Sequence, residues 1–179
     1  MNHLKIFLAS SIVEFADDRM SLKNFIRQIE NILIDQNIFL RMFICEYADN
    51  AIADERKQNE FLREIDDSDI FLILSGKNLG AYTLEEYQYA VSLHERRNDG
   101  LPKILAAFKI CDELGQSVKD FSAMLSADVE RINFKEITEL KAALVKVIGT
   151  LLPGGLIRVE SNKVIIAEKT IKLYNKAGI

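Results

Sequence analysis

The stretch that decides the fold runs from Asp69 to Ala90 and reads DIFLILSGKNLGAYTLEEYQYA. Its first part is an unbroken apolar run, Ile70–Leu74, which predicts a strand buried on both faces. A loop with two glycines ends that strand, and a helix is expected from Leu84 to about Arg96. Ligands of open α/β sheets bind at the carboxyl ends of the strands. Any chemistry is therefore expected near the start of this helix.

Apolar runs of the same kind recur along the chain and alternate with segments of helical spacing. Strands are expected near residues 4–9, 38–45, 69–75, 103–108 and 130–134. This alternation predicts an α/β fold, a flavodoxin-like three-layer sandwich in which a five-stranded parallel sheet has helices on both faces. The third strand is expected at the centre because its apolar run is continuous. The first helix is expected from Asp18 to about Gln36, with Asp17 or Asp18 as its cap.

A change in pattern after the last expected helix divides the chain into two parts. Residues 1–151 are expected to form the sheet domain, which Pro153-Gly154-Gly155 ends. Residues 152–179 are expected to form a hairpin around Ser161-Asn162, followed by a short helix. Because a two-stranded hairpin is only marginally stable by itself, this segment either docks on the sheet domain or begins a following domain.

Composition limits the classes of partner and site. The chain has 179 residues, of which 49% are hydrophobic and 28% charged, and its net charge is -4. This balance gives no reason to expect nucleic acid or a membrane as partner, because both favour a concentrated basic face. With only His3, His94, Cys45 and Cys111 and no CxxC spacing, a metal site is not expected. The two lone cysteines are interpreted as buried thiols of a cytoplasmic protein.

Glu86 is the leading candidate for a catalytic group. The expected core face of its helix carries Leu84, Tyr87, Val91 and His94. At about 100° per residue, Glu86 lies beside that face, whereas Glu85 points away from it. Thr83 and Glu86 also have the spacing of a capping box, in which each side chain bonds the other residue's backbone amide. The residues alone leave both the catalytic and the capping interpretation open.

Three further candidates surround the end of the first expected strand. Ser10 and Ser11 follow that strand, and their hydroxyls could bond sugar or phosphate oxygens, although an ordinary polar turn has the same composition. Arg19 could pair with a phosphate or with an acid such as Glu46, or be an exposed structural arginine. His94 is expected to be a packed histidine. The chain has no P-loop, GxGxxG loop or GxSxG elbow.

These segments resemble a known family. Lys5–Ser11, Arg19, the strand Asp69–Leu74 and the segment Tyr82–Ala90 resemble bacterial TIR-like (Toll/interleukin-1 receptor) domains. More narrowly, they resemble a divergent branch found at the front of multidomain bacterial proteins. The resemblance spans roughly residues 4 to 151 and implies a five-stranded parallel sheet.

The resemblance also implies an activity. Many TIR domains cleave the nicotinamide–ribose bond of NAD+ with a glutamate in the helix after the third strand, and the pattern Glu-aromatic-x-x-Ala assigns that position to Glu86. It further implies ligand contacts at Ser10, Ser11, Arg19 and Tyr82, self-association through the domain, and a role in bacterial antiviral defence signalling. NAD+ or a related nucleotide would then be the substrate, with no separate cofactor.

The chain departs from the family at two places. The segment Glu46–Glu55 lacks the glycine-bearing loop of typical TIR domains, and no tryptophan is present to stack on nicotinamide, so Tyr82, Phe43 or Tyr47 would have to replace it. Two alternatives to an NAD+ hydrolase therefore stay open. One is a non-catalytic TIR-type interaction module, and the other is a nucleoside deoxyribosyltransferase-like enzyme, which uses a carboxylate as nucleophile.

Overall fold

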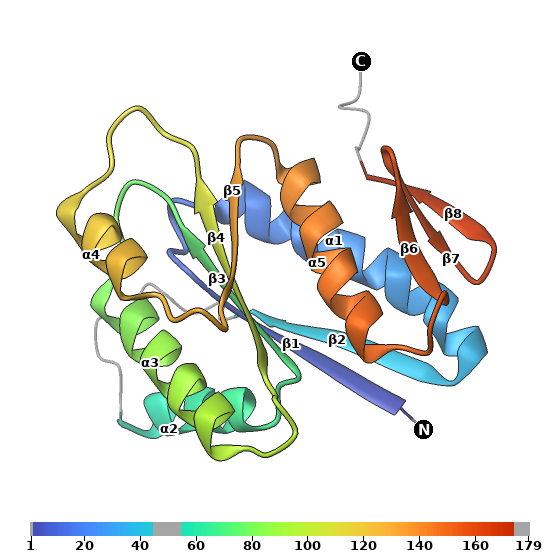
Figure 1. Cartoon of the computed structure of the whole chain (residues 1–179), viewed down its shortest axis with the longest axis horizontal. Helices are drawn as coiled ribbons and strands as arrows, with labels where there is room; N and C mark the ends of the chain where they lie inside the picture. Colours follow the sequence, from blue (N-terminus) through green and yellow to red (C-terminus); the bar gives the residue numbers. More distant parts are fainter. Residues whose placement is uncertain (1, 45–54, 174–179) are drawn as a thin grey trace.

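The computed structural model describes residues 2–44 and 55–173, and its centre is a five-stranded parallel sheet (Figure 1). The strands are β1 (Asn2–Ser10), β2 (Ile38–Ile44), β3 (Ile70–Ser75), β4 (Lys103–Lys109) and β5 (Glu130–Phe134). Their order is β2-β1-β3-β4-β5, with every pair parallel. The predicted flavodoxin-like architecture is therefore confirmed, with the fully buried β3 at the centre.

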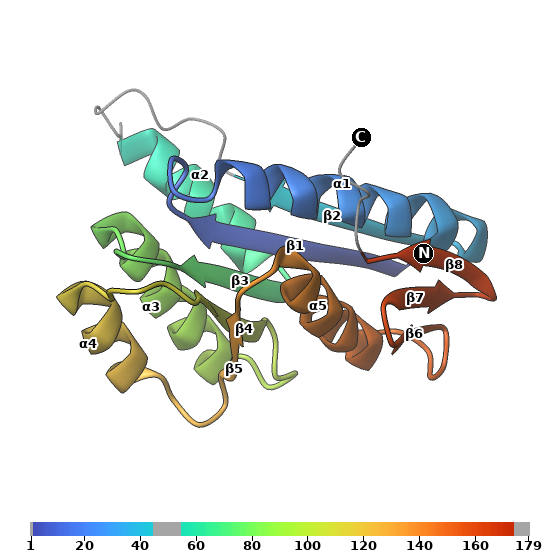
Figure 2. The ribbon, with the colours of Figure 1, turned by 90° about the horizontal axis from the view of Figure 1, so that it is seen from above.

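Helices cover both faces of this sheet (Figure 2). The helical elements are α1 (Ala16–Leu33), the 3-10 turn η1 (Ile34–Gln36), α2 (Glu55–Asp66), α3 (Ala81–Arg96), α4 (Gln116–Met124) and α5 (Ile137–Leu151). Side chains alternate between faces along a strand. Ile6 and Leu8 accordingly pack with α1 and α5 in one core. Phe7 and Ala9 pack with α2, α3 and α4 in the other.

The C-terminal segment docks on the α1 and α5 side of the sheet domain. It forms a second, antiparallel sheet of β6 (Ile157–Glu160), β7 (Lys163–Ile166) and β8 (Lys169–Lys172). Apolar side chains of this sheet belong to the same core as α1 and α5. The hairpin lies where the sequence predicts it, but the predicted short helix is wrong, because Lys169–Lys172 pairs with β7 as a strand. Residues 174–179 lie outside the described part of the chain.

Two smaller expectations are also wrong. Helix α1 begins at Ala16, two residues before the predicted start, so Asp17 and Asp18 lie in its first turn and neither caps it. Acidic side chains in a first helical turn still interact favourably with the helix dipole. Cys111 is exposed, because it lies beyond the end of β4 and not in the core. Cys45 lies outside the described residues.

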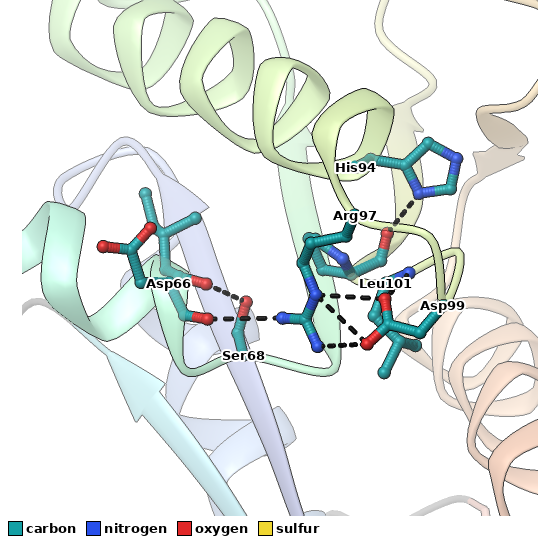
Figure 3. A network of polar contacts seen from close by, with 8 residues as sticks. Asp66, Ser68, His94, Arg97, Asp99 and Leu101 are labelled. Atoms are coloured by element: carbon teal, nitrogen blue, oxygen red, sulfur yellow. Dashed lines mark hydrogen bonds and ion pairs between the residues drawn. The ribbon is translucent and has the colours of Figure 1, made fainter.

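A polar network joins the loops at the amino edge of the sheet, where β3 and β4 begin (Figure 3). Arg97 donates to both carboxylate oxygens of Asp99 and to the Asp66 backbone carbonyl. The Asp99 carboxylate also accepts from the Leu101 amide. His94 Nδ1 lies 3.1 Å from the Pro102 carbonyl oxygen. His94 is thus a packed histidine, as predicted, and it places the end of α3 at this edge.

Candidate functional site

The candidate site lies at the opposite, carboxyl edge, between β1 and β3. The chain passes from β1 to β2 on one side and then to β3 on the other side of β1, so the strand order reverses between β1 and β3. Loops diverge at such a reversal and leave a crevice in which doubly wound proteins bind ligands. Ser10 ends β1 and pairs in register with Leu74 of β3. The residues that follow these two strands therefore surround the crevice.

Helix α3 begins one turn earlier than the capping box requires. Its N-cap is Gly80, in an extended conformation, and the Leu84 amide donates to the Gly80 carbonyl at 3.1 Å. Thr83 therefore lies inside the first turn and is not the N-cap residue. The capping interpretation of Glu86 is wrong for this reason, and its carboxylate needs another explanation.

The face of α3 that packs on the sheet also differs from the predicted one. Its buried residues are Thr83, Glu86, Tyr87 and Ala90, whereas Leu84, Val91 and His94 are half-buried. The small side chain of Ala90 is fully buried against the sheet core. Glu86, one turn before Ala90, consequently lies on the buried face itself. Glu85 is exposed, as predicted.

The Glu86 carboxylate is unusual in its electrostatics. The side chain is only 8% exposed. Burial raises the pKa of Glu86 to about 7, while the charge of Arg19 pulls it down and that of Glu85 pushes it up. Desolvation outweighs the attraction of the arginine. A buried carboxylate with a pKa near neutrality is a candidate for catalysis.

Arg19 approaches the same edge from the other face of the sheet. It lies in the first turn of α1 and is 6% exposed. The alternative interpretation of Arg19 as an exposed structural arginine is therefore wrong. The neighbouring Asp18 pairs with Lys109, at the end of β4, at 2.6 Å, which fixes the start of α1 over the sheet edge. Arg19 also lines a hollow of about 290 Å³ together with Lys23 and Ile44. Glu46, its predicted partner, lies outside the described residues.

The remaining predicted residues have different surroundings. The Ser10 hydroxyl is buried and has no hydrogen-bond partner in the described part of the chain. The Ser11 hydroxyl accepts a hydrogen bond from the Glu14 amide at 3.3 Å, as expected for an ordinary polar turn. Ser11 also lines a hollow of about 560 Å³. Tyr82 is 62% exposed on the first turn of α3. Phe43 stacks on Phe7 at 5.4 Å, and Tyr47 lies outside the described residues.

Two residues at this edge are not among those predicted from the sequence. Ser75, at the end of β3, is 1% exposed, and its hydroxyl also has no partner among the described residues. Glu14 accepts a hydrogen bond from the Lys77 amide at 2.5 Å and so joins the loops after β1 and β3. A hydroxyl residue directly after a fully apolar strand is the one signal that could have identified Ser75. Glu14 has no such signal, because its partner is distant in sequence.

A further hollow lies along the edge strand β2. Its volume is about 600 Å³, and it includes Lys23 and Phe43 but none of Glu86, Ser10, Ser11, Arg19 and Tyr82. No group of three or more His, Cys, Asp or Glu side chains within residues 2–44 and 55–173 could hold a metal ion. Within the described part of the chain, no helix combines the length and the apolar character needed to cross a membrane.

Comparison with known proteins finds a likeness in fold to a solved structure. No family model matches the chain, and no curated protein matches it significantly. The fold is similar to that of a CMP N-glycosidase from Clostridium botulinum, with 14% sequence identity and a TM-score of 0.48. The likeness covers 78% of this chain and 97% of that one. It concerns the arrangement of strands and helices alone and does not identify a substrate.

Proposed function

We propose that the chain is a TIR-like domain that hydrolyses NAD+ at the nicotinamide–ribose bond in bacterial defence signalling, with Glu86 as its catalytic carboxylate. The observation that carries the proposal is the buried Glu86 side chain at the β1/β3 edge, with a pKa raised to about 7. Burying a carboxylate without a capping role costs stability. Such a cost is typical of functional sites.

The chemistry of NAD+ suits a site with a single carboxylate. A glycosidase acting on an ordinary sugar needs one carboxyl to protonate the leaving oxygen and a second to act on the sugar. In NAD+ the leaving nitrogen is already cationic. When the C1′–N bond breaks, its electron pair neutralises the pyridinium, and water adds to C1′ with loss of one proton. The ionised Glu86 then stabilises the positive charge that develops on the ribose.

The charges around the crevice suit the rest of the substrate. Arg19 and Lys23 lie on the α1 side, where their positive charge would attract the pyrophosphate. Ser10 and Ser11 lie at the end of β1 between this cationic side and α3. Tyr82, exposed beside the start of α3, offers an aromatic ring for stacking on a base.

The experiment is incubation of concentrated protein with NAD+, with free nicotinamide measured by chromatography. Wild-type protein should release nicotinamide, Glu86→Gln should not, and the adjacent Glu85→Gln should remain nearly as active. Glu85→Gln is a matched control because it makes the same chemical change one residue away on an exposed position. Self-association predicts that activity rises more than linearly with protein concentration. Intact NAD+ at every concentration, or an active Glu86→Gln, would contradict the proposal.

The same pKa favours a second candidate, an N-glycosidase of ordinary nucleotides. At pH 7 about half of the Glu86 side chains are protonated, so Glu86 could donate a proton to a neutral leaving base. The two candidates differ in the sign of their pH dependence. An NAD+ hydrolase needs the ionised form, so its rate should rise through pH 7. A nucleotide N-glycosidase that uses Glu86 as an acid should slow over the same range.

A further inference from the structure

The buried hydroxyl of Ser75 has no partner in the described part of the chain, which is costly for a folded protein. A buried polar group left without a hydrogen bond costs about 1–3 kcal/mol, and such groups in native structures need an explanation. Ser68 gives the contrast. It is equally buried, at 1% exposed, but its hydroxyl donates to the Ile65 carbonyl at 2.8 Å.

Ser75 lies on the same side of the sheet as Glu86. Along β3, Phe71 and Ile73 face the core under α3, and the alternation of the strand places Ser75 on that side as well. Glu86 lies on the sheet-facing side of α3, close to its start. Because α3 begins at the carboxyl edge, where β3 ends, both residues lie at the same end of the same face.

The loop that follows Ser75 is held in place from both sides. The Lys77 amide donates to the Glu14 carboxylate, and the Lys77 carbonyl accepts from the Gly115 amide at 2.8 Å. The Leu79 amide donates to the Ser117 hydroxyl at 3.1 Å. These contacts join the loops after β1 and β3 to the start of α4. The backbone of Ser75 is thus positioned before any ligand arrives, as binding sites require.

We infer that Ser75 is a substrate-binding residue that hydrogen-bonds a hydroxyl of the ribose attached to the leaving base. The inference rests on the proposed function and extends it to a residue outside the predicted set. A neutral sugar hydroxyl suits the position better than a phosphate does. A phosphate beside the buried Glu86 would place two negative charges together in a dry site. A ribose hydroxyl can donate to the Glu86 carboxylate and accept from the Ser75 hydroxyl.

The test compares Ser75→Ala with Ser68→Ala in urea unfolding and in NAD+ hydrolysis. Ser75→Ala should be as stable as wild type or more stable, because it removes an unsatisfied group, and its KM for NAD+ should rise roughly 5- to 10-fold for one lost hydrogen bond. Ser68→Ala should lose stability and keep its KM, because Ser68 lies at the amino edge. Ser75→Ala with lower stability and an unchanged KM would overturn the inference.

Substrate analogues test the contact directly. Wild type should lose activity or affinity with an NAD+ analogue lacking the 2′- or the 3′-hydroxyl of the nicotinamide ribose. Ser75→Ala should be several-fold less sensitive to the same omission, because its partner is already missing. Equal sensitivity of both proteins to both analogues would overturn the assignment.

Binding of ADP-ribose, measured by calorimetry, separates this inference from the proposed function. If wild type hydrolyses NAD+ and Ser75→Ala matches it in every parameter, the hydrolase stands and Ser75 has no role. If wild type does not hydrolyse NAD+ but binds ADP-ribose more tightly than Ser75→Ala does, the hydrolase fails and the Ser75 contact stands. If wild type neither hydrolyses NAD+ nor binds ADP-ribose, both fail.

Discussion

Replacing Glu86 with glutamine is expected to stabilise the protein at alkaline pH. Burial raises the pKa of Glu86 from an ordinary value of 4.5 to about 7, against the attraction of Arg19. The folded protein therefore holds this proton more tightly than the unfolded chain does, and its stability falls as the pH rises towards and through 7. Over the full titration the free energy of unfolding falls by about 3 kcal/mol. About 1.4 kcal/mol of this decrease occurs between pH 6 and pH 8.5.

Urea unfolding of wild type and Glu86→Gln across this pH range measures the effect. Glutamine keeps the shape of the side chain but does not titrate, so the difference between the two curves isolates Glu86. The variant should be about 2 kcal/mol more stable near pH 6 and about 3 kcal/mol more stable near pH 8.5. Glu85→Gln, at an exposed position, should show no such trend. If Glu86→Gln is no more stable than wild type at pH 8.5, the reasoning is refuted. The folded protein would then stabilise the ionised form of Glu86 in its buried position.

Three further substitutions test other parts of the structure. Lys141→Met should raise the melting temperature, because the Lys141 side chain is 2% exposed against the Phe25 ring and burial lowers the pKa of its ammonium group. A lower melting temperature would mean that the surroundings stabilise the buried charge. Arg97→Ala should lower the melting temperature but leave the KM for NAD+ unchanged, since its contacts lie at the amino edge, and a raised KM would contradict this. Gly76→Ala should lower kcat/KM, because a β-carbon there would overlap the Glu14 carboxylate; unchanged kinetics would show that the loop adjusts.

Much of the fold could be predicted because its signals are local. The continuous apolar run of β3 needs no knowledge of its neighbours to indicate a buried central strand. Helix starts were predicted less well. Thr83 and Glu86 have the sequence of a capping box but lie inside α3, whereas Glu136 and Glu139 form a real capping box at the start of α5 without a serine or threonine. The packing of each helix on the sheet decides where it begins.

The site was predicted only in part for a similar reason. Glu86 could be found because helical spacing places it near the sheet, and that spacing is readable in one segment. Ser75 could not be found, because its significance lies in the absence of a partner, which depends on every element around it. The β8 strand was missed because Lys169–Lys172 becomes a strand by pairing with β7, and four residues alone carry too weak a pattern.

The docking of the C-terminal sheet decides where the domain can be shortened. Ending an expression plasmid's coding region after α5 would agree with the sequence pattern, but it would remove six buried side chains, Leu152, Ile157, Val164, Ile166, Ile171 and Leu173. At about 1.5–3 kcal/mol for each, this loss is as large as the entire stability of an ordinary domain. The truncated product would also present the bare flanks of α1 and α5 to other chains. Inclusion bodies, and not a smaller working domain, are the expected yield of such a cut.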